Sequence, residues 1–76
     1  MKFHIRDVVS QFSQESEIPA DTVREAALEV IRRKEAVEAR TIHSDALALD
    51  DARDVFETLR AYRDSGTLTP EGGDGE

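Results

Sequence analysis

The side chains that could do chemistry in this chain form no known catalytic or metal-binding pattern. Asp50 and Asp54 are four residues apart and would share one face of a helix, where two carboxylates could hold a divalent cation. We favour a simpler interpretation, because acidic side chains are stabilised at the start of a helix. His4 and His43 each lack the second His three or four residues on that a helical metal pair needs. We expect no catalytic residue, no metal and no cofactor.

The one basic cluster consists of Arg32, Arg33 and Lys34, and it falls inside a helical pattern beside several glutamates. Three such charges neutralise two or three phosphates, whereas nucleic-acid-binding surfaces present a broad basic patch. The whole chain carries a net charge of −7, and residues 41–76 hold nine carboxylates against three cations. We therefore interpret the cluster as a solvated helix face and keep nucleic-acid binding as an alternative.

Length and composition limit the chain to one small domain. A chain of 76 residues buries only about 60–65% of the surface that it exposes when unfolded, so its core is small. The absence of Cys excludes a disulfide framework and favours a reducing, cytoplasmic setting. The longest apolar run has four residues, against the roughly 20 that cross a bilayer, and no signal peptide is visible. We expect a soluble protein that does not bind membranes.

Apolar residues recur at helical spacing in three segments, which predicts an all-α fold of three helices. The first helix, over residues 5–16, is short. The second spans about residues 19–40 and opens at Pro19, whose missing N–H costs nothing in a first helical turn. Its apolar face ends where the basic cluster begins, so its last turns have little to anchor them. The residues of this face are Val23, Ala27, Val30 and Ile31.

The third predicted helix has the cleanest apolar face of the chain. Ser44 and Asp50 are both competent N-caps for its start, and Gly66 is placed to end it. Beyond that glycine, residues 67–76 are rich in Gly, Pro and acidic side chains, which predicts a disordered acidic tail after a helical domain of residues 1–66. The apolar face of this helix includes Val55, Phe56, Leu59 and Tyr62.

Two families resemble parts of this chain. A short helix, then Ile-Pro-Ala-Asp at residues 18–21 opening a long helix, then a third helix, is an order similar to the histone fold, and this implies a dimer. At the N-terminus, apolar residues alternate with Lys2, His4 and Arg6, as in a short strand. In this respect the chain resembles ribbon-helix-helix repressors and antitoxins. That resemblance implies a strand that reads the major groove and an acidic C-terminal segment that binds a toxin.

From the sequence we predict a small acidic helical domain that binds another protein, in the first place a second copy of itself. We expect no enzymatic activity and no small-molecule substrate. The two apolar faces exceed what the short first helix can cover, and small domains often solve this by oligomerising. The predicted interface therefore consists of the two faces, Val23, Ala27, Val30, Ile31, Val55, Phe56, Leu59 and Tyr62.

The alternative is a DNA-binding regulator or antitoxin of the ribbon-helix-helix or histone-fold type. The state of residues 2–6 distinguishes the ribbon-helix-helix hypothesis from the first one, since that family needs a strand there and an all-α domain does not. The candidate nucleic-acid contacts are Lys2, His4, Arg6, Arg32, Arg33 and Lys34.

Overall fold

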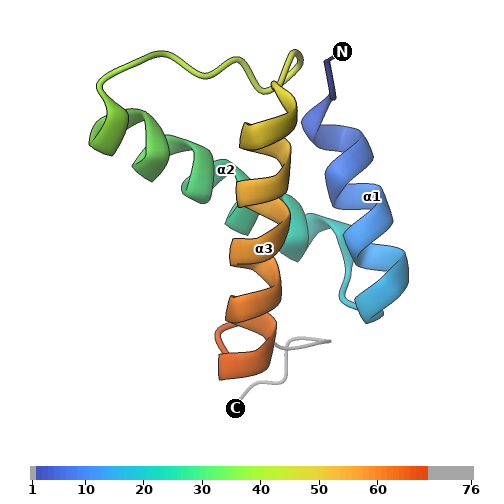
Figure 1. Ribbon diagram of the computed structural model, residues 1–76. Helices are drawn as coiled ribbons and strands as arrows, with labels where there is room; N and C mark the ends of the chain where they lie inside the picture. The colour runs from blue at the N-terminus through green and yellow to red at the C-terminus, as the bar shows by residue number, and fades with distance from the viewer. Residues whose placement is uncertain (1, 69–76) are drawn as a thin grey trace.

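Three helices make up most of the part of the chain that the structure describes. This computed structural model describes residues 2–68 and places α1 at Ile5–Ser16, α2 at Ala20–Glu38 and α3 at Leu49–Ser65. α1 and α3 lie side by side, and α2 crosses behind α3 so that its second half projects beyond the other two helices (Figure 1). The predicted all-α fold of three helices is confirmed.

α1 has the predicted bounds because local hydrogen bonds close both of its ends. At its start, His4 Nδ1 accepts a hydrogen bond of 2.9 Å from the backbone N–H of Arg6. At its end, Glu17 adopts the left-handed conformation, and its N–H donates to the Ser13 carbonyl at 2.9 Å. The Ser13 hydroxyl then donates to the carbonyl of Ile18 at 2.6 Å. These bonds fix the turn into α2.

The segment before α1 pairs with the loop before α3. Phe3 and Leu47 exchange backbone hydrogen bonds of 2.8 and 2.7 Å in an isolated antiparallel bridge. The N–H of Ile5 donates to the carbonyl of Ser44 at 2.7 Å. Together with the complete burial of Leu47, these contacts hold this part of the loop outside a helix. A helix start at Ser44 is therefore wrong, and α3 begins one residue before the other predicted cap, Asp50.

α2 ends slightly earlier than predicted, at Glu38. Ala39 adopts the left-handed conformation with φ 53, and its N–H donates to the carbonyl of Glu35. After Ile31 no residue of α2 is buried, and Val37 is 85% exposed. The last turns of α2 thus have no buried apolar side chain, as the interrupted apolar pattern indicated, and the loop of residues 39–48 connects their far end to α3 (Figure 1).

The core draws on all three helices and on the connections between them. Its largest fully buried side chains are Phe12, Ile18, Leu47, Leu59, Val23 and Val55. Leu68, which the sequence assigned to the tail, is only 5% exposed and belongs to this core. Its N–H donates to the carbonyl of Tyr62 at 3.1 Å. The packed structure therefore extends past the predicted boundary at residue 66, while residues 69–76 of the predicted tail lie outside the described residues.

Replacing Leu68 by Ala is expected to lower the free energy of unfolding by about 2–3 kcal/mol, because the change leaves a cavity beside the end of α3. Leu49 is 52% exposed, and Leu49→Ala removes the same atoms, so we expect a loss below about 1 kcal/mol. Urea denaturation of both variants measures the difference. Equal losses would contradict a core position for Leu68.

Candidate protein-interaction groove

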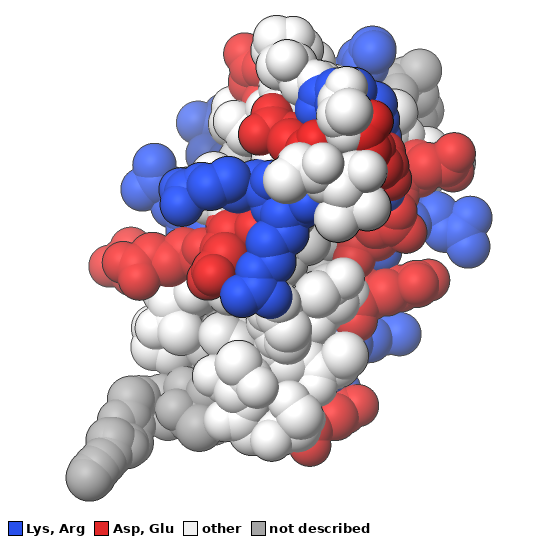
Figure 2. Space-filling view, turned by 90° about the vertical axis from the view of Figure 1, so that its left-hand side faces the viewer, with Lys and Arg blue, Asp and Glu red and all other residues white. Residues whose placement is uncertain are grey.

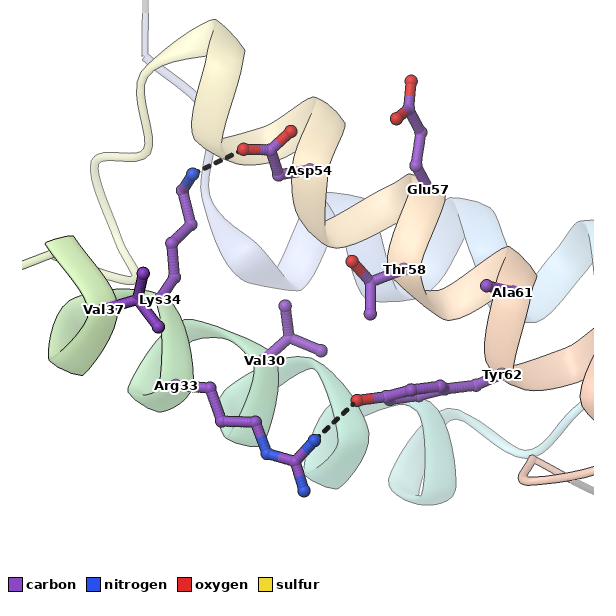
Figure 3. A pocket seen from close by; sticks show the side chains of 9 residues that line it. All are labelled: Val30, Arg33, Lys34, Val37, Asp54, Glu57, Thr58, Ala61 and Tyr62. Carbon is purple, nitrogen blue, oxygen red and sulfur yellow. Dashed lines mark hydrogen bonds and ion pairs between the residues drawn. The ribbon is translucent and has the colours of Figure 1, made fainter.

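α2 and α3 leave between them a groove of about 490 Å³. Figure 3 shows that Val30 and Thr58 point toward each other across its floor. Apolar carbon contributes most of the lining, through the valines of α2, Ala61 and the ring of Tyr62. The complete lining is Val30, Arg33, Lys34, Val37, Asp54, Glu57, Thr58, Ala61 and Tyr62.

Val37 is the unusual residue of the groove. It lies two helical turns beyond Val30 on the same side of α2, but Val30 is 7% exposed whereas Val37 is 85% exposed. The difference arises because α3 covers only the first of these two turns, while the second belongs to the projecting end of the helix (Figure 1). An apolar groove thus continues into an uncovered apolar side chain.

Two polar bridges join α2 to α3 across the groove. Lys34 Nζ contacts the Asp54 carboxylate at one end, and Arg33 Nη1 donates to the Tyr62 hydroxyl at 3.2 Å at the other (Figure 3). Arg33 also pairs with Glu29, four residues earlier on α2, at 3.0 Å. Tyr62 is half-buried against the core, and its hydroxyl lies at the exposed rim. The bridges connect the two helices without filling the groove.

A network of charges anchors the end of the groove near the loop. Asp51, in the first turn of α3, has a side chain that is only 5% exposed. It accepts hydrogen bonds of 2.6 and 3.3 Å from Arg40 in the loop. Arg40 also contacts Glu38 at 2.7 Å, and Lys34 Nζ lies 2.8 Å from the same glutamate. The network therefore ties the end of α2 and the loop to the start of α3.

The same network changes the proton affinities of its members. The hydrogen bond from Arg40 holds the pKa of the Asp51 carboxyl below its ordinary value, although burial acts in the opposite direction. Hydrogen bonds from Lys34 and then Arg40 lower the pKa of Glu38. The contact with Asp54 is the largest cause that raises the pKa of Lys34. Asp51, Glu38 and Lys34 are therefore all ionised at neutral pH.

The two rims of the groove carry opposite charges. On the α2 rim, the Arg33 side chain is 66% exposed. On the α3 rim, Asp54 and Glu57 are exposed, and Glu57 makes no ion pair with any residue of the described part of the chain. Figure 2, which faces the projecting end of α2, shows basic and acidic side chains next to one another above a mostly uncharged lower part. The groove thus has a basic side chain on its α2 rim and acidic side chains on its α3 rim.

The interface residues predicted from the sequence lie mostly in the core. Six of the eight, Val23, Ala27, Val30, Ile31, Val55 and Leu59, are at most 7% exposed within the single chain. Phe56 and Tyr62 are partly buried against the same core. A long uncovered face on α2 is therefore no argument for a dimer. Local spacing did not predict that Val37, Thr58 and Ala61 line one groove, although the interrupted apolar pattern of α2 set its last turns apart.

The candidate nucleic-acid contacts lie in the segment before α1, in α1 and in α2, and some of them already bind other side chains of the chain. Lys2 and His4 precede α1, and α1 begins at Ile5, so Arg6 is helical. Within residues 2–68, the single Phe3–Leu47 bridge is the only strand-like pairing, and it joins two segments of one chain. This differs from a ribbon-helix-helix strand. Of the basic cluster, Arg33 and Lys34 hold the two groove bridges, and Arg32 is exposed.

Within residues 2–68, no group of three or more His, Cys, Asp and Glu side chains could hold a metal ion. Asp54, one of the two carboxylates considered for a cation, instead contacts Lys34. In the same part of the chain, no helix is long and apolar enough to span a membrane. No known protein family, curated protein or solved structure matches the chain.

Proposed function

We propose that this domain is a non-catalytic protein-interaction module that pairs with a second copy of itself through the groove between α2 and α3. The observation that carries the proposal is Val37, 85% exposed at the edge of an apolar groove. Removing apolar surface from water contributes about 25 cal/mol per Å². A complex in which a partner covers both Val37 and the groove is stabilised by this burial. The isolated chain leaves the same surface in water.

The charges on the rims favour a second copy as that partner. A two-fold contact uses the same surface on both subunits, so the surface must complement itself. A two-fold axis running along the groove would place α2 of each copy over α3 of the other. Arg33 on one copy would then face Glu57 on its partner, and the reverse pair would form by symmetry. The opposite signs of the rims make this arrangement electrostatically favourable.

The groove is small, which limits the strength of the pair. Stable dimers usually bury about 1,600 Å² in total, and smaller interfaces form weak or transient complexes. The rim charges are also solvated, so each ion pair adds little free energy. We therefore expect a dissociation constant on the order of micromolar to tens of micromolar.

Val37→Glu is expected to raise the dimer dissociation constant at least about 30-fold, because it places a charge in an apolar contact. Ala36→Glu makes the same change of charge one residue away, at an exposed position that does not line the groove, and should change the constant less than about threefold. Sedimentation equilibrium over a range of concentrations measures the dissociation constants of the wild type and of the two variants. Circular dichroism confirms that the variants remain folded.

Exchange of the rim charges provides an independent test. Arg33→Glu and Glu57→Arg should each weaken the dimer, and the double variant should recover part of the affinity, because it restores an opposite pair in every two-fold contact. A wild-type chain that stays monomeric at about 1 mM would refute self-pairing. Equal effects of Val37→Glu and Ala36→Glu would place the contact elsewhere.

A further inference from the structure

The opposite edge of α3, where it meets α1, has a different chemistry from the groove. It carries a small apolar cleft of about 180 Å³ that includes Phe3, Leu49 and Phe56 in its lining. Leu49 is 52% exposed, and both phenylalanines are only partly buried. Arg53 also lines this cleft. The lining of the cleft itself includes no carboxylate, although Arg53 also lines a neighbouring pocket with Asp50 and Glu57.

Three arginines follow this edge of α3 at helical spacing. Arg53 and Arg60 are seven residues apart, which is two turns or about 10 Å along the helix, and Arg63 continues the row. The Arg60 guanidinium lies 5.0 Å from the centre of the Phe56 ring, and that of Arg63 lies 5.9 Å from the centre of the Phe12 ring. Aromatic rings thus hold two of the guanidinium groups in place, which lowers the entropy cost of binding an anion.

Arg53 and Arg60 have no carboxylate partner in the part of the chain that the structure describes. The ion pairs found there use Arg33, Lys34, Arg40 and Arg63 as cations. This is notable in a chain with 17 acidic residues against 10 basic ones. Two exposed arginines beside an apolar cleft therefore retain all their donors for a ligand.

We infer that this face, Phe3, Leu49, Arg53, Phe56 and Arg60, binds an acidic amphipathic helix of another protein. One apolar side chain of that helix fills the cleft, and two carboxylates about 10 Å apart accept hydrogen bonds from Arg53 and Arg60. Arginine and aromatic residues together are typical of the energetic centre of protein interfaces. The apolar cleft favours a helix, which can supply an apolar side chain, over a polyphosphate chain, which has none.

The probe is a synthetic helical peptide with two Glu residues seven positions apart and Leu residues between them, measured by fluorescence anisotropy. We expect micromolar binding, and at least about 10-fold weaker binding to the Arg53→Glu/Arg60→Glu variant. The matched control is Arg24→Glu/Arg32→Glu, two exposed arginines of α2 with the same change of net charge, for which we expect less than about a threefold loss. Circular dichroism confirms that both variants are folded.

Further probes test whether the peptide binds at this face and whether the face prefers an acidic helix to DNA. A peptide with Lys in place of Glu should not bind, and a 20-base-pair DNA duplex should bind no better to the wild type than to the Arg53→Glu/Arg60→Glu variant. The Val37→Glu variant should bind the acidic peptide as well as the wild type does, which keeps this test independent of self-pairing. Absence of peptide binding, equal losses in the two arginine variants, or DNA binding that depends on Arg53 and Arg60 would each overturn the inference.

Discussion

Phe12→Ala is expected to lower the free energy of unfolding by about 3–5 kcal/mol, which leaves little or no folded protein. The Phe12 ring is fully buried and packs edge to face against Phe56, with centroids 5.5 Å apart and an angle of 88°. Its removal leaves a cavity where α1 meets α3. A domain of 76 residues has only about 4–11 kcal/mol of stability to lose. Thermal unfolding followed by circular dichroism measures the loss.

Phe56→Ala is the matched control, because it removes the other ring of the same pair from a side chain that is only partly buried. We expect a smaller loss, about 1.5–2.5 kcal/mol, and a folded variant at room temperature. The double variant should lose less than the sum of the two single losses, since the ring contact is lost only once. A folded Phe12→Ala protein with an unchanged melting temperature would contradict the packing around α1.

Arg40→Met is expected to lower the free energy of unfolding, because it leaves the buried carboxylate of Asp51 with Lys34 as its nearest cation, at 3.7 Å. The loss should fall below that of a fully buried ion pair, since Arg40 is 46% exposed. In an Asp51→Asn background the same substitution should cost clearly less than in the wild type, because no buried carboxylate is then left without its partner. Urea denaturation of the four proteins completes the double-mutant cycle. Additive losses would show that Arg40 and Asp51 are not coupled.

The Asp51 carboxyl also predicts the response of the domain to acid. Its pKa is lower in the folded chain than the ordinary value of about 3.9, so the unfolded chain binds a proton more readily. The stabilisation is present above about pH 4 and is lost as the pH falls through the lower folded pKa. The stability difference between the wild type and Asp51→Asn should therefore shrink between pH 7 and pH 2.5. A difference that does not change with pH would contradict the ion pair.

Local signals in the sequence were enough for the fold class and for several helix ends. Ile5 to Phe12 at helical spacing predicted α1 with its observed bounds, since its caps come from neighbouring residues. Gly66 ends α3 in the left-handed conformation, with φ 85, as predicted. The interrupted pattern after Ile31 indicated that the last turns of α2 have no buried apolar side chain. In each case the deciding contacts lie within a few residues along the chain.

Only the tertiary structure decided which apolar residues are covered. Sequence periodicity shows that Val30 and Leu59 share a face with other apolar side chains, but it does not show what covers them. In the folded chain both are buried, and the exposed residue is Val37, which the pattern alone did not distinguish. Its exposure depends on where α3 lies relative to α2, and this position is set by contacts between distant residues.

Contacts between distant residues also decide where α3 starts and where the two charged surfaces lie. Ser44 is a competent N-cap by type, but its carbonyl accepts the N–H of Ile5, nearly 40 residues earlier in the chain. Arg40 and Asp51 are 11 residues apart and pair only because the loop brings them together. The sequence by itself therefore determined a small all-α domain with an acidic surface. The position of the groove and of the exposed arginines of α3 depended on long-range packing, which local spacing does not encode.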